Sequence, residues 1–146
     1  MPLSKLDQSS SLDQWLSHLE TLHPKAIDLG LDRTRTVAGN LGLTFPFITI
    51  TVGGTNGKGS TCAMLEAILL AAGYRVGMYT SPHLIDYNER IRLNGEIAGD
   101  AQIVEQFHAI DQARGDVSLS YFEFSTLAAL RLFEQQKVDV AVLEVG

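Results

Sequence analysis

Apolar runs alternate along the chain with segments in which apolar residues recur at helical spacing. The runs cover residues 47–52, 74–80 and 138–146, and their length and β-branched or aromatic content are typical of buried strands. The helical segments are bounded by capping residues and glycines and cover residues 12–22, 32–41, 60–72, 100–114 and 122–136. Strands that alternate with helices predict an α/β fold, in which helices flank both faces of a parallel sheet.

One segment departs from this alternation. The sequence RIRLNGEIA, residues 90–98, places the pair Asn94–Gly95 between short runs of alternating apolar and polar residues. This pair is a strong signal for a two-residue hairpin turn, because both positions of that turn need a positive φ. We therefore expect a hairpin between the second strand and the helix that begins at Asp100.

The 146 residues show no repeat, no low-complexity tract and no internal linker, so we expect one domain. Only three parallel strands are predicted, and Gly146 directly follows the third, where such a fold should turn into its next helix. We therefore expect a truncated domain. The last strand is apolar on both faces, and we expect its uncovered surface to make the chain self-associate.

Composition narrows the function classes. The chain is 45% hydrophobic and 19% charged, as in globular proteins, and its net charge of −6 argues against a general nucleic-acid binder. The single cysteine, Cys62, cannot form an internal disulfide, which favours a reducing compartment. The sequence shows no basic-then-apolar leader and no apolar run near 18 residues, so we expect a cytoplasmic protein without a membrane partner.

Four glycines and a lysine lie within GGTNGKGS, residues 53–60, between the first strand and the next helix. A strand that enters such a loop and then a helix directs backbone N–H groups and the positive end of the helix at one point, which suits a polyphosphate. The match to G-x-x-x-x-G-K-[ST] is imperfect, because Val52 takes the place of the first glycine and Gly59 follows Lys58. The alternative is a structural turn with a solvated lysine; we favour a phosphate loop.

Because no hydroxyl residue directly follows Lys58, the loop alone does not decide which residues bind the metal. Ser60 or Thr61 could replace it, or the metal could be held from another loop. Ligands of parallel sheets lie at the carboxyl ends of the strands, where TSPH and LEVG place Ser81 and Glu144. Both offer oxygens that suit a hard cation, although Glu144 could instead cap a following helix. His83 could contact phosphate or metal, or order its loop.

Taken together, GTNGKGS, TSPHL, ERIRLNG, SYFEFSTLAAL and the terminal LEVG resemble the folylpolyglutamate synthase family, above all its bacterial bifunctional members that are also dihydrofolate synthases. The family belongs to the Mur-ligase-like ATP-dependent amide ligases. The resemblance implies a P-loop NTPase-like Mur-ligase central domain. Residues 1–146 would form this N-terminal ATP-binding domain, incomplete at its C-terminal end, and the family's C-terminal glutamate-ligase domain is absent from the sequence.

The resemblance also implies a reaction and its residues. ATP phosphorylates a substrate carboxylate, and the amino group of L-glutamate attacks the acyl phosphate. The implied catalytic residue is Lys58, the implied Mg²⁺ ligands are Ser81 and Glu144, and the implied ATP-binding residues are Asn56, Gly57, Lys58, Gly59 and Ser60. The implied dihydropteroate site consists of Asp28, Leu29, Gly30, Leu31, Ser120, Tyr121, Phe122 and Glu123.

The sequence leaves several interpretations open. In the pterin site, Tyr121 or Phe122 would stack on the ring and a carboxylate would pair with ring nitrogens, whereas Glu123 could instead serve the helix dipole. Cys62 is interpreted as a packing residue. Four arginines are interpreted mainly as solvated charges: Arg33, Arg35, Arg90 and Arg92. An arginine near the end of the second strand could instead meet a phosphate or a carboxylate.

The expected function is ATP-dependent ligation of L-glutamate to dihydropteroate and to folates, with small molecules as partners and a monomeric full-length protein. The alternatives are another Mur-type amide ligase, acting on a cell-wall precursor, and a nucleotide-binding regulatory module. Residues 1–146 alone are expected to bind nucleotide weakly and to catalyse no ligation.

Overall fold

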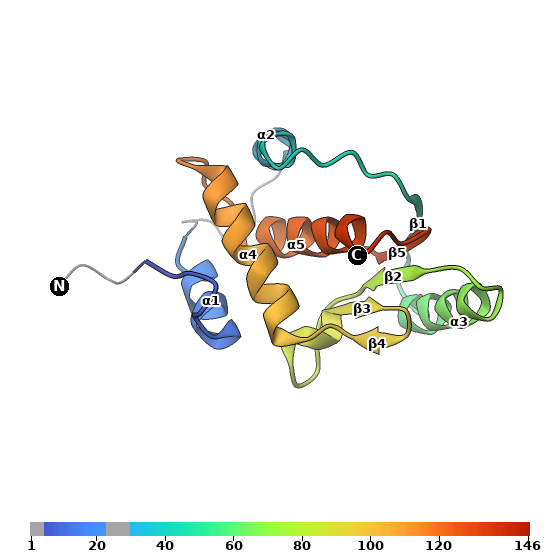
Figure 1. Ribbon diagram of the computed structural model, residues 1–146. Coiled ribbons are helices and arrows are strands. Elements are labelled where there is room, and N and C mark those ends of the chain that lie inside the picture. The colour runs from blue at the N-terminus through green and yellow to red at the C-terminus, as the bar shows by residue number, and fades with distance from the viewer. Residues whose placement is uncertain (1–4, 23–29) are drawn as a thin grey trace. The chain divides into compact units, whose positions relative to one another are not determined.

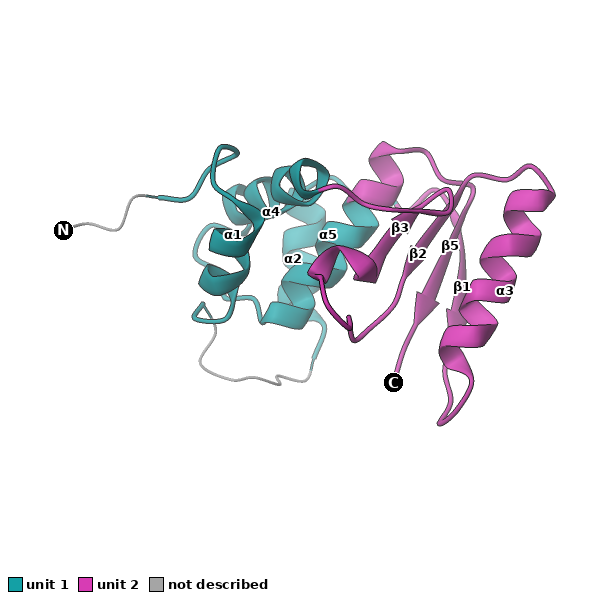
Figure 2. Cartoon of the chain, turned by 90° about the horizontal axis from the view of Figure 1, so that it is seen from below, with its two compact units in different colours: residues 1–44, 100–131 teal, residues 45–99, 132–146 magenta. Residues whose placement is uncertain are grey.

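The computed structural model describes residues 5–22 and 30–146 (Figure 1). The chain divides into two compact units, which Figure 2 shows in different colours. Unit 1 comprises residues 1–44 and 100–131, and unit 2 comprises residues 45–99 and 132–146. Within the described ranges, no helix combines the length and the apolar character that crossing a membrane requires.

Unit 1 is helical. It contains α1 (Leu12–Leu19), α2 (Asp32–Asn40), α4 (Asp100–Arg114) and the part of α5 (Tyr121–Gln135) up to Arg131. Helix α1 begins with a capping box, in which the Ser11 hydroxyl accepts from the Gln14 amide and the Gln14 side chain accepts from the Ser11 amide. The predicted N-cap is thus confirmed, whereas the helix ends three residues before the predicted end.

The core of unit 1 is built on aromatic side chains. Trp15 of α1 is fully buried and packs on Phe107 of α4, with ring centroids 6.3 Å apart. Phe107 in turn meets Phe124 of α5 edge to face at 5.7 Å. The indole nitrogen of Trp15 donates to the backbone oxygen of Asp7 at 3.0 Å, so this buried polar group is satisfied. Helices α1 and α2 both contact α4.

Unit 2 contains a five-stranded sheet in the order β1-β5-β2-β3-β4. Its strands are β1 (Ile48–Val52), β2 (Val76–Tyr79), β3 (Ile91–Leu93), β4 (Glu96–Ile97) and β5 (Val140–Glu144). The first, second and fifth strands run parallel as predicted, but β3 pairs with both β2 and β4 in antiparallel fashion. The sheet is therefore mixed, and the prediction of a parallel sheet is correct only for those three strands.

The antiparallel pairing follows from the short connection between β2 and β3. A parallel return needs a crossover of a dozen or more residues, usually with an α-helix. The connection here contains only the one-turn 3₁₀ helix η1 (Tyr87–Arg90). The predicted hairpin is confirmed, because β3 and β4 are joined by Asn94 and Gly95, with φ angles of 51° and 85°.

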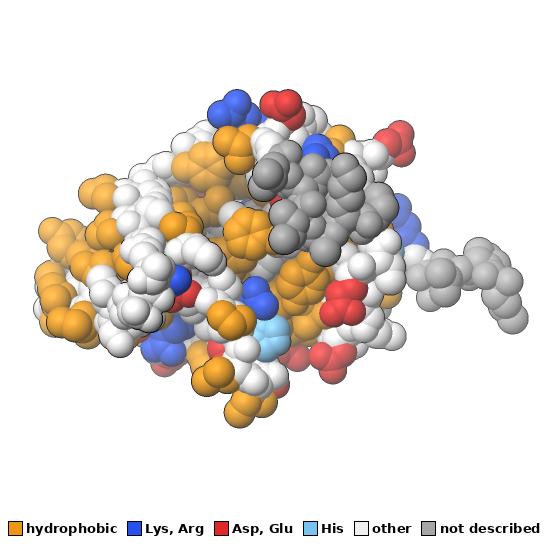
Figure 3. Space-filling view, turned by 180° about the vertical axis from the view of Figure 1, so that it is seen from behind, with side chains coloured by type: hydrophobic (Ala, Val, Ile, Leu, Met, Phe, Trp, Pro, Cys, Tyr) orange, Lys and Arg blue, Asp and Glu red, His pale blue; other side chains and the backbone are white. Residues whose placement is uncertain are grey.

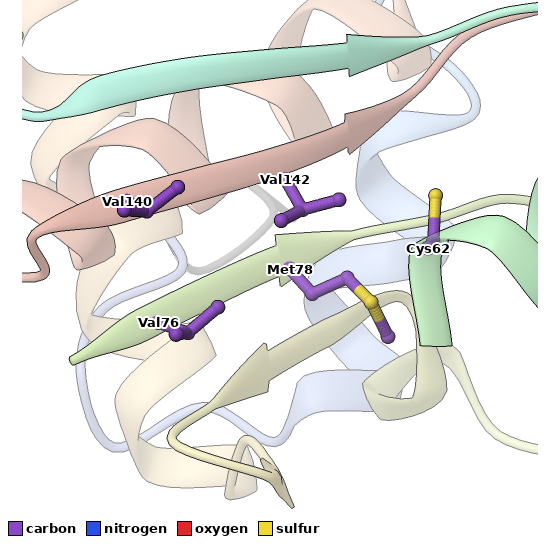
Figure 4. Close-up of a cluster of buried hydrophobic side chains, with 5 residues drawn as sticks. All are labelled: Cys62, Val76, Met78, Val140 and Val142. Atoms are coloured by element: carbon purple, nitrogen blue, oxygen red, sulfur yellow. The ribbon is translucent and has the colours of Figure 1, made fainter. Parts of the chain in front are cut away.

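Helix α3 (Lys58–Ala71) covers one face of the sheet. Figure 4 shows the cluster that forms there, which consists of Cys62, Val76, Met78, Val140 and Val142. Because side chains alternate along a strand, Gly77 of β2 faces the opposite side. There it meets Phe133, which lies in the part of α5 that belongs to unit 2 and is fully buried.

Gly77→Ala is expected to destabilise the chain by about 1–3 kcal/mol, the usual effect of overpacking a core. A Cβ at residue 77 would lie 2.5–2.7 Å from three ring atoms of Phe133, which is fully buried. Urea unfolding followed by circular dichroism measures the effect. In the control Gly39→Ala, within α2, the new Cβ meets no atom within 4 Å, and stability should rise by up to about 1 kcal/mol. Equal stability of both variants would contradict this view of the packing.

The expectation that the last strand leaves an apolar surface uncovered is wrong. Strand β5 lies between β1 and β2, and Val140 and Val142 are buried. Apolar side chains reach the surface elsewhere, as Figure 3 shows for one face. The large apolar side chains with high exposed fractions include Ile48 on β1 and Met64 and Ile68 on α3. Among the described strands, none pairs with the outer edge of β1. Self-association stays a prediction, but the surface predicted for it, on β5, is flanked by β1 and β2.

Candidate functional site

The carboxyl ends of β1, β5 and β2 lie side by side, because these three strands are parallel neighbours. The loop after β1 leads to Gly57, which adopts a left-handed conformation with φ 77° and is the N-cap of α3. Helix α3 begins at Lys58, two residues before the predicted start, so that Lys58, Gly59 and Ser60 form its first turn. In the described chain no side chain caps this end of α3, which leaves the role of acceptor to a ligand or to water.

The side chain of Lys58 folds back over the loop. Its Nζ donates to the backbone oxygen of Gly54 at 2.7 Å. The same Nζ lies 2.8 Å from the position that a Cβ on Gly146 would take, so it reaches the segment that follows β5. Lys58 is half-buried, whereas Asn56, Gly57, Gly59 and Ser60 are exposed. The Lys58 ammonium group is thus held by a neutral backbone carbonyl of the loop after β1.

Ser81 and Glu144 meet at the same end of the sheet. Glu144 is the last residue of β5, and its Oε1 accepts from the backbone N–H of Ser81 at 3.3 Å. Its Oε2 lies 3.7 Å from the position of a Cβ on Gly59. The structure therefore brings the first turn of α3, Ser81 and Glu144 together, as the sequence predicts from the strand ends.

A metal ion at this place would have few protein ligands. Within residues 5–22 and 30–146, no group of three His, Cys, Asp or Glu side chains could hold a metal ion. Mg²⁺ in nucleotide sites usually takes only one or two carboxylates and fills its other positions with water and phosphate oxygens. A neighbouring hydroxyl and carboxylate, as in Ser81 and Glu144, fit this donor set.

Cys62 lies one turn into α3 and is fully buried. Burial raises the pKa of its thiol, and the nearby carboxylate of Glu144 raises the pKa further. The thiolate is therefore disfavoured, and the side chain acts as a small apolar group in the cluster with Val76 and Met78. This agrees with the interpretation of Cys62 as a packing residue.

The loop after Ser81 is held by its own hydrogen bonds. His83 Nδ1 accepts from Arg90 Nε at 2.8 Å. The Glu89 carboxylate accepts from three successive backbone amides, of residues 84, 85 and 86, which lower its pKa. His83 thus makes the loop-ordering bond, and Arg90 is not the solvated charge that the sequence suggested. Sequence analysis missed Glu89, although its spacing from Asp86 is that of a capping box.

The candidate pterin residues lie in unit 1, where Asp28 and Leu29 fall outside the described residues. Leu31, which is 60% exposed, is the N-cap of α2, and Gly30 precedes it. Ser120 directly precedes α5 and is buried, and residues 121–123 are in the first turn of this helix. Of its two aromatic residues, Phe122 is the more exposed at 58%, while Tyr121 is half-buried.

Glu123 is surrounded by donors. Its carboxylate accepts from Arg33 Nη2 at 2.9 and 3.0 Å, from Thr34 Oγ1 at 3.0 Å and from the Ser120 amide at 3.0 Å. Burial alone raises the pKa of Glu123, but these hydrogen bonds outweigh it and the net pKa is lowered. The carboxylate therefore stabilises the fold above the ordinary pKa of glutamate, and this contribution is lost as the pH falls through the lowered pKa.

The partners of Glu123 were not found from the sequence. Arg33 was interpreted as a solvated charge, and this is wrong, because it pairs with a carboxylate that is only 8% exposed. Arg92 likewise pairs with the buried Glu66. Arg33 and Glu123 are 90 positions apart, and no local spacing signals such a contact.

Comparisons with known proteins agree with the resemblance. No family model matches the chain. It is 54% identical over 139 residues to the dihydrofolate synthase/folylpolyglutamate synthase of Escherichia coli, which covers 94% of this chain and 33% of the relative. It is also 54% identical over 143 residues to the protein of that name from Haemophilus influenzae, which covers 97% of this chain and 32% of the relative.

Solved structures give the same result. The structure of E. coli FolC in complex with DHPP and ADP matches with a TM-score of 0.91 and 52% identity, over 97% of this chain and 34% of that one. The bifunctional enzyme of Yersinia pestis complexed with AMPPNP and Mn ion matches with a TM-score of 0.90 and 52% identity, over 98% and 35%. The chain spans about a third of the length of the curated relatives that it matches. Over that third, the chain belongs to the dihydrofolate synthase/folylpolyglutamate synthase family.

Proposed function

We propose that this chain supplies the nucleotide-binding and pteroate-binding parts of an ATP-dependent amide ligase, which joins L-glutamate to dihydropteroate and to folates. The observation that carries the proposal is the convergence of Lys58, Ser81 and Glu144 at the ends of three adjacent parallel strands. Relatives of known structure are in complex with DHPP and ADP, or with Mn, AMPPNP and L-glutamate.

The proposed reaction has two steps. A carboxylate oxygen of the pteroate attacks the γ-phosphorus of ATP, the bond to the β-γ bridging oxygen breaks, and ADP leaves. The amino nitrogen of glutamate then attacks the carbonyl carbon of the acyl phosphate, loses a proton, and the tetrahedral intermediate expels phosphate to leave an amide. Phosphoryl transfer requires mainly alignment and neutralisation of charge from the protein.

In this proposal the first turn of α3 binds the phosphates. Its uncapped amides and the positive end of the helix favour an anion. Lys58 exchanges the oxygen of Gly54 for a phosphate oxygen, which needs only a rotation of its side chain. The half-buried position of Lys58 makes its charge more effective there than on an open surface.

We assign Ser81 and Glu144 as the residues that would hold Mg²⁺. The ion, when bound, would neutralise part of the phosphate charge. The hydrogen bond from the Ser81 amide keeps the Glu144 carboxylate next to Ser81. In the pteroate-binding segment, Phe122 rather than Tyr121 is placed to stack on a flat ring, because it is the more exposed of the two.

We also propose that residues 1–146 bind ligands but do not ligate on their own. The chain spans about a third of the length of its curated relatives, and the proposed roles of Lys58, Ser81, Glu144 and Phe122 cover the phosphates, the metal and the pteroate but not the glutamate. Without alignment of the amine against the acyl phosphate, the second step has no catalyst.

The test is a calorimetric titration of the chain with dihydropteroate and, separately, with a UDP-linked cell-wall precursor. Binding of dihydropteroate but not of the precursor is expected. The variant Phe122→Ala should weaken dihydropteroate binding by about tenfold, the equivalent of one lost stacking contact, and should leave ATP binding unaltered. Preference for the UDP-linked compound would favour the other Mur-type ligases, and binding of ATP alone would favour a regulatory module.

A further inference from the structure

The start of α5 and the residues at the start of α2 are joined by one charged contact. Arg33 and Thr34, in the first turn of α2, reach Glu123 in the first turn of α5 through three hydrogen bonds of 2.9–3.0 Å. These two places adjoin Gly30–Leu31 and Phe122, which are among the candidate pterin residues predicted from the sequence. The contact is thus a link between two segments that lie far apart in the sequence.

The carboxylate of Glu123 has no acceptor capacity left. A carboxylate offers about four lone-pair sites on its two oxygens. Here Oε1 accepts from Arg33 and from the Ser120 amide, and Oε2 accepts from Arg33 and Thr34. A ring N–H of a pterin could bind to Glu123 only if it displaced one of these donors. Since Glu123 is buried, the displaced donor would lose its partner inside the protein.

We propose that Glu123 is a positioning residue: its pair with Arg33 sets the distance between Phe122 and the Gly30–Leu31 segment, so that both meet one pteroate molecule. The inference rests on the proposed function for its ligand. It replaces the direct role that the sequence suggested for this carboxylate. The two hydrogen bonds between Ser120 and Glu123 stabilise only the first turn of α5. The hydrogen bonds from Arg33 and Thr34 connect this turn to α2.

The test separates positioning from simple stabilisation. Loss of one partner alone would leave a buried charge and could unfold the unit. The double variant Arg33→Met/Glu123→Gln removes both charges, and glutamine at 123 can still accept from the Ser120 amide. Removal of a whole ion pair in favour of groups of similar volume is often neutral for stability. The fold of this variant is therefore expected to persist, while the ion pair between the two segments is lost and only the hydrogen bond with Thr34 can still connect them.

Calorimetric titrations with 7,8-dihydropteroate and with MgATP measure the two affinities, and thermal unfolding measures stability. The double variant is expected to raise the Kd for dihydropteroate about tenfold and to leave the Kd for MgATP and the Tm near those of the wild type. The matched control Asp111→Asn/Arg114→Met removes another ion pair of unit 1, within α4, and should change neither Kd.

Three outcomes would overturn the inference. An unchanged Kd for dihydropteroate in the double variant would show that the pair does not position the site, and would leave the proposed function standing. A lower Tm with equal loss of both affinities would show that the pair serves the fold. A wild-type chain that binds MgATP but no dihydropteroate would overturn the proposed substrate, and the inference with it.

Discussion

Lys58→Ala is expected to weaken binding of ATP to the chain strongly and to lower phosphoryl transfer about 100-fold or more in a ligase that contains these residues. Lys58 is the first residue of α3, and its Nζ lies between Gly54 and the segment at Gly146. A lysine there adds a full charge to the partial charge of the helix end. Alanine retains the helix start, because the left-handed turn is made by Gly57.

The measurement is a titration of the wild type and of Lys58→Ala with ATP, combined with thermal unfolding of both proteins. Lys5→Ala, which removes the same charge from an exposed position in unit 1, is the matched control and should bind ATP like the wild type. Equal ATP affinity for Lys58→Ala and the wild type would show that the glycine-rich loop is a structural turn with a solvated lysine. The thermal scan excludes loss of the fold as the cause of weaker binding.

The secondary structure was predictable wherever the signal is local. The Asn94–Gly95 turn, the Ser11 cap and the glycine stops of the helices depend only on neighbouring residues. The predicted start of α3 lies two residues after the observed one, because the helix begins with a lysine and a glycine, which are not the usual first-turn residues. Its N-cap, Gly57, supplies backbone geometry instead of a side-chain acceptor.

The order of the strands in the sheet was harder to predict from the sequence than the secondary structure. The sequence shows that residues 138–146 form an apolar strand, but not whether that strand is central or at an edge. The structure places it between β1 and β2, where parallel pairing on both sides accounts for its apolar character. The interpretation as an uncovered strand failed because pairing partners are set by the whole sheet.

The contacts of the candidate site also include some that the sequence predicts and some that it does not. Ser81 and Glu144 could be predicted to meet, since the carboxyl ends of parallel strands share one edge of the sheet. The pair of Arg33 with Glu123 could not, because an ion pair across 90 positions depends on how α2 and α5 pack in unit 1. Arginine is mostly exposed in proteins, so a sequence-based rule predicts a solvated side chain. The rule fails for Arg33 because this residue pairs with the buried carboxylate of Glu123.

Glu144→Gln is expected to increase the Mg²⁺ concentration needed for half-maximal ATP binding by about 10–100-fold, the range seen when metal sites lose a supporting group. Glutamine has nearly the same shape and can still accept from the Ser81 amide, so the loop after β2 should stay in place. What changes is the charge, which contributes more to a hard cation than a hydroxyl does. Ser81→Ala should therefore have the smaller effect.

Titrations of ATP binding against Mg²⁺ for both variants decide the order of the two effects. Glu96→Gln makes the same substitution at an exposed position on β4 and should leave the Mg²⁺ dependence unchanged. If Glu144→Gln behaved like this control, the carboxylate would have no part in metal binding. Its contact with the Ser81 amide would then be purely structural, and the interpretation of Glu144 as a helix-capping acceptor would replace the metal assignment.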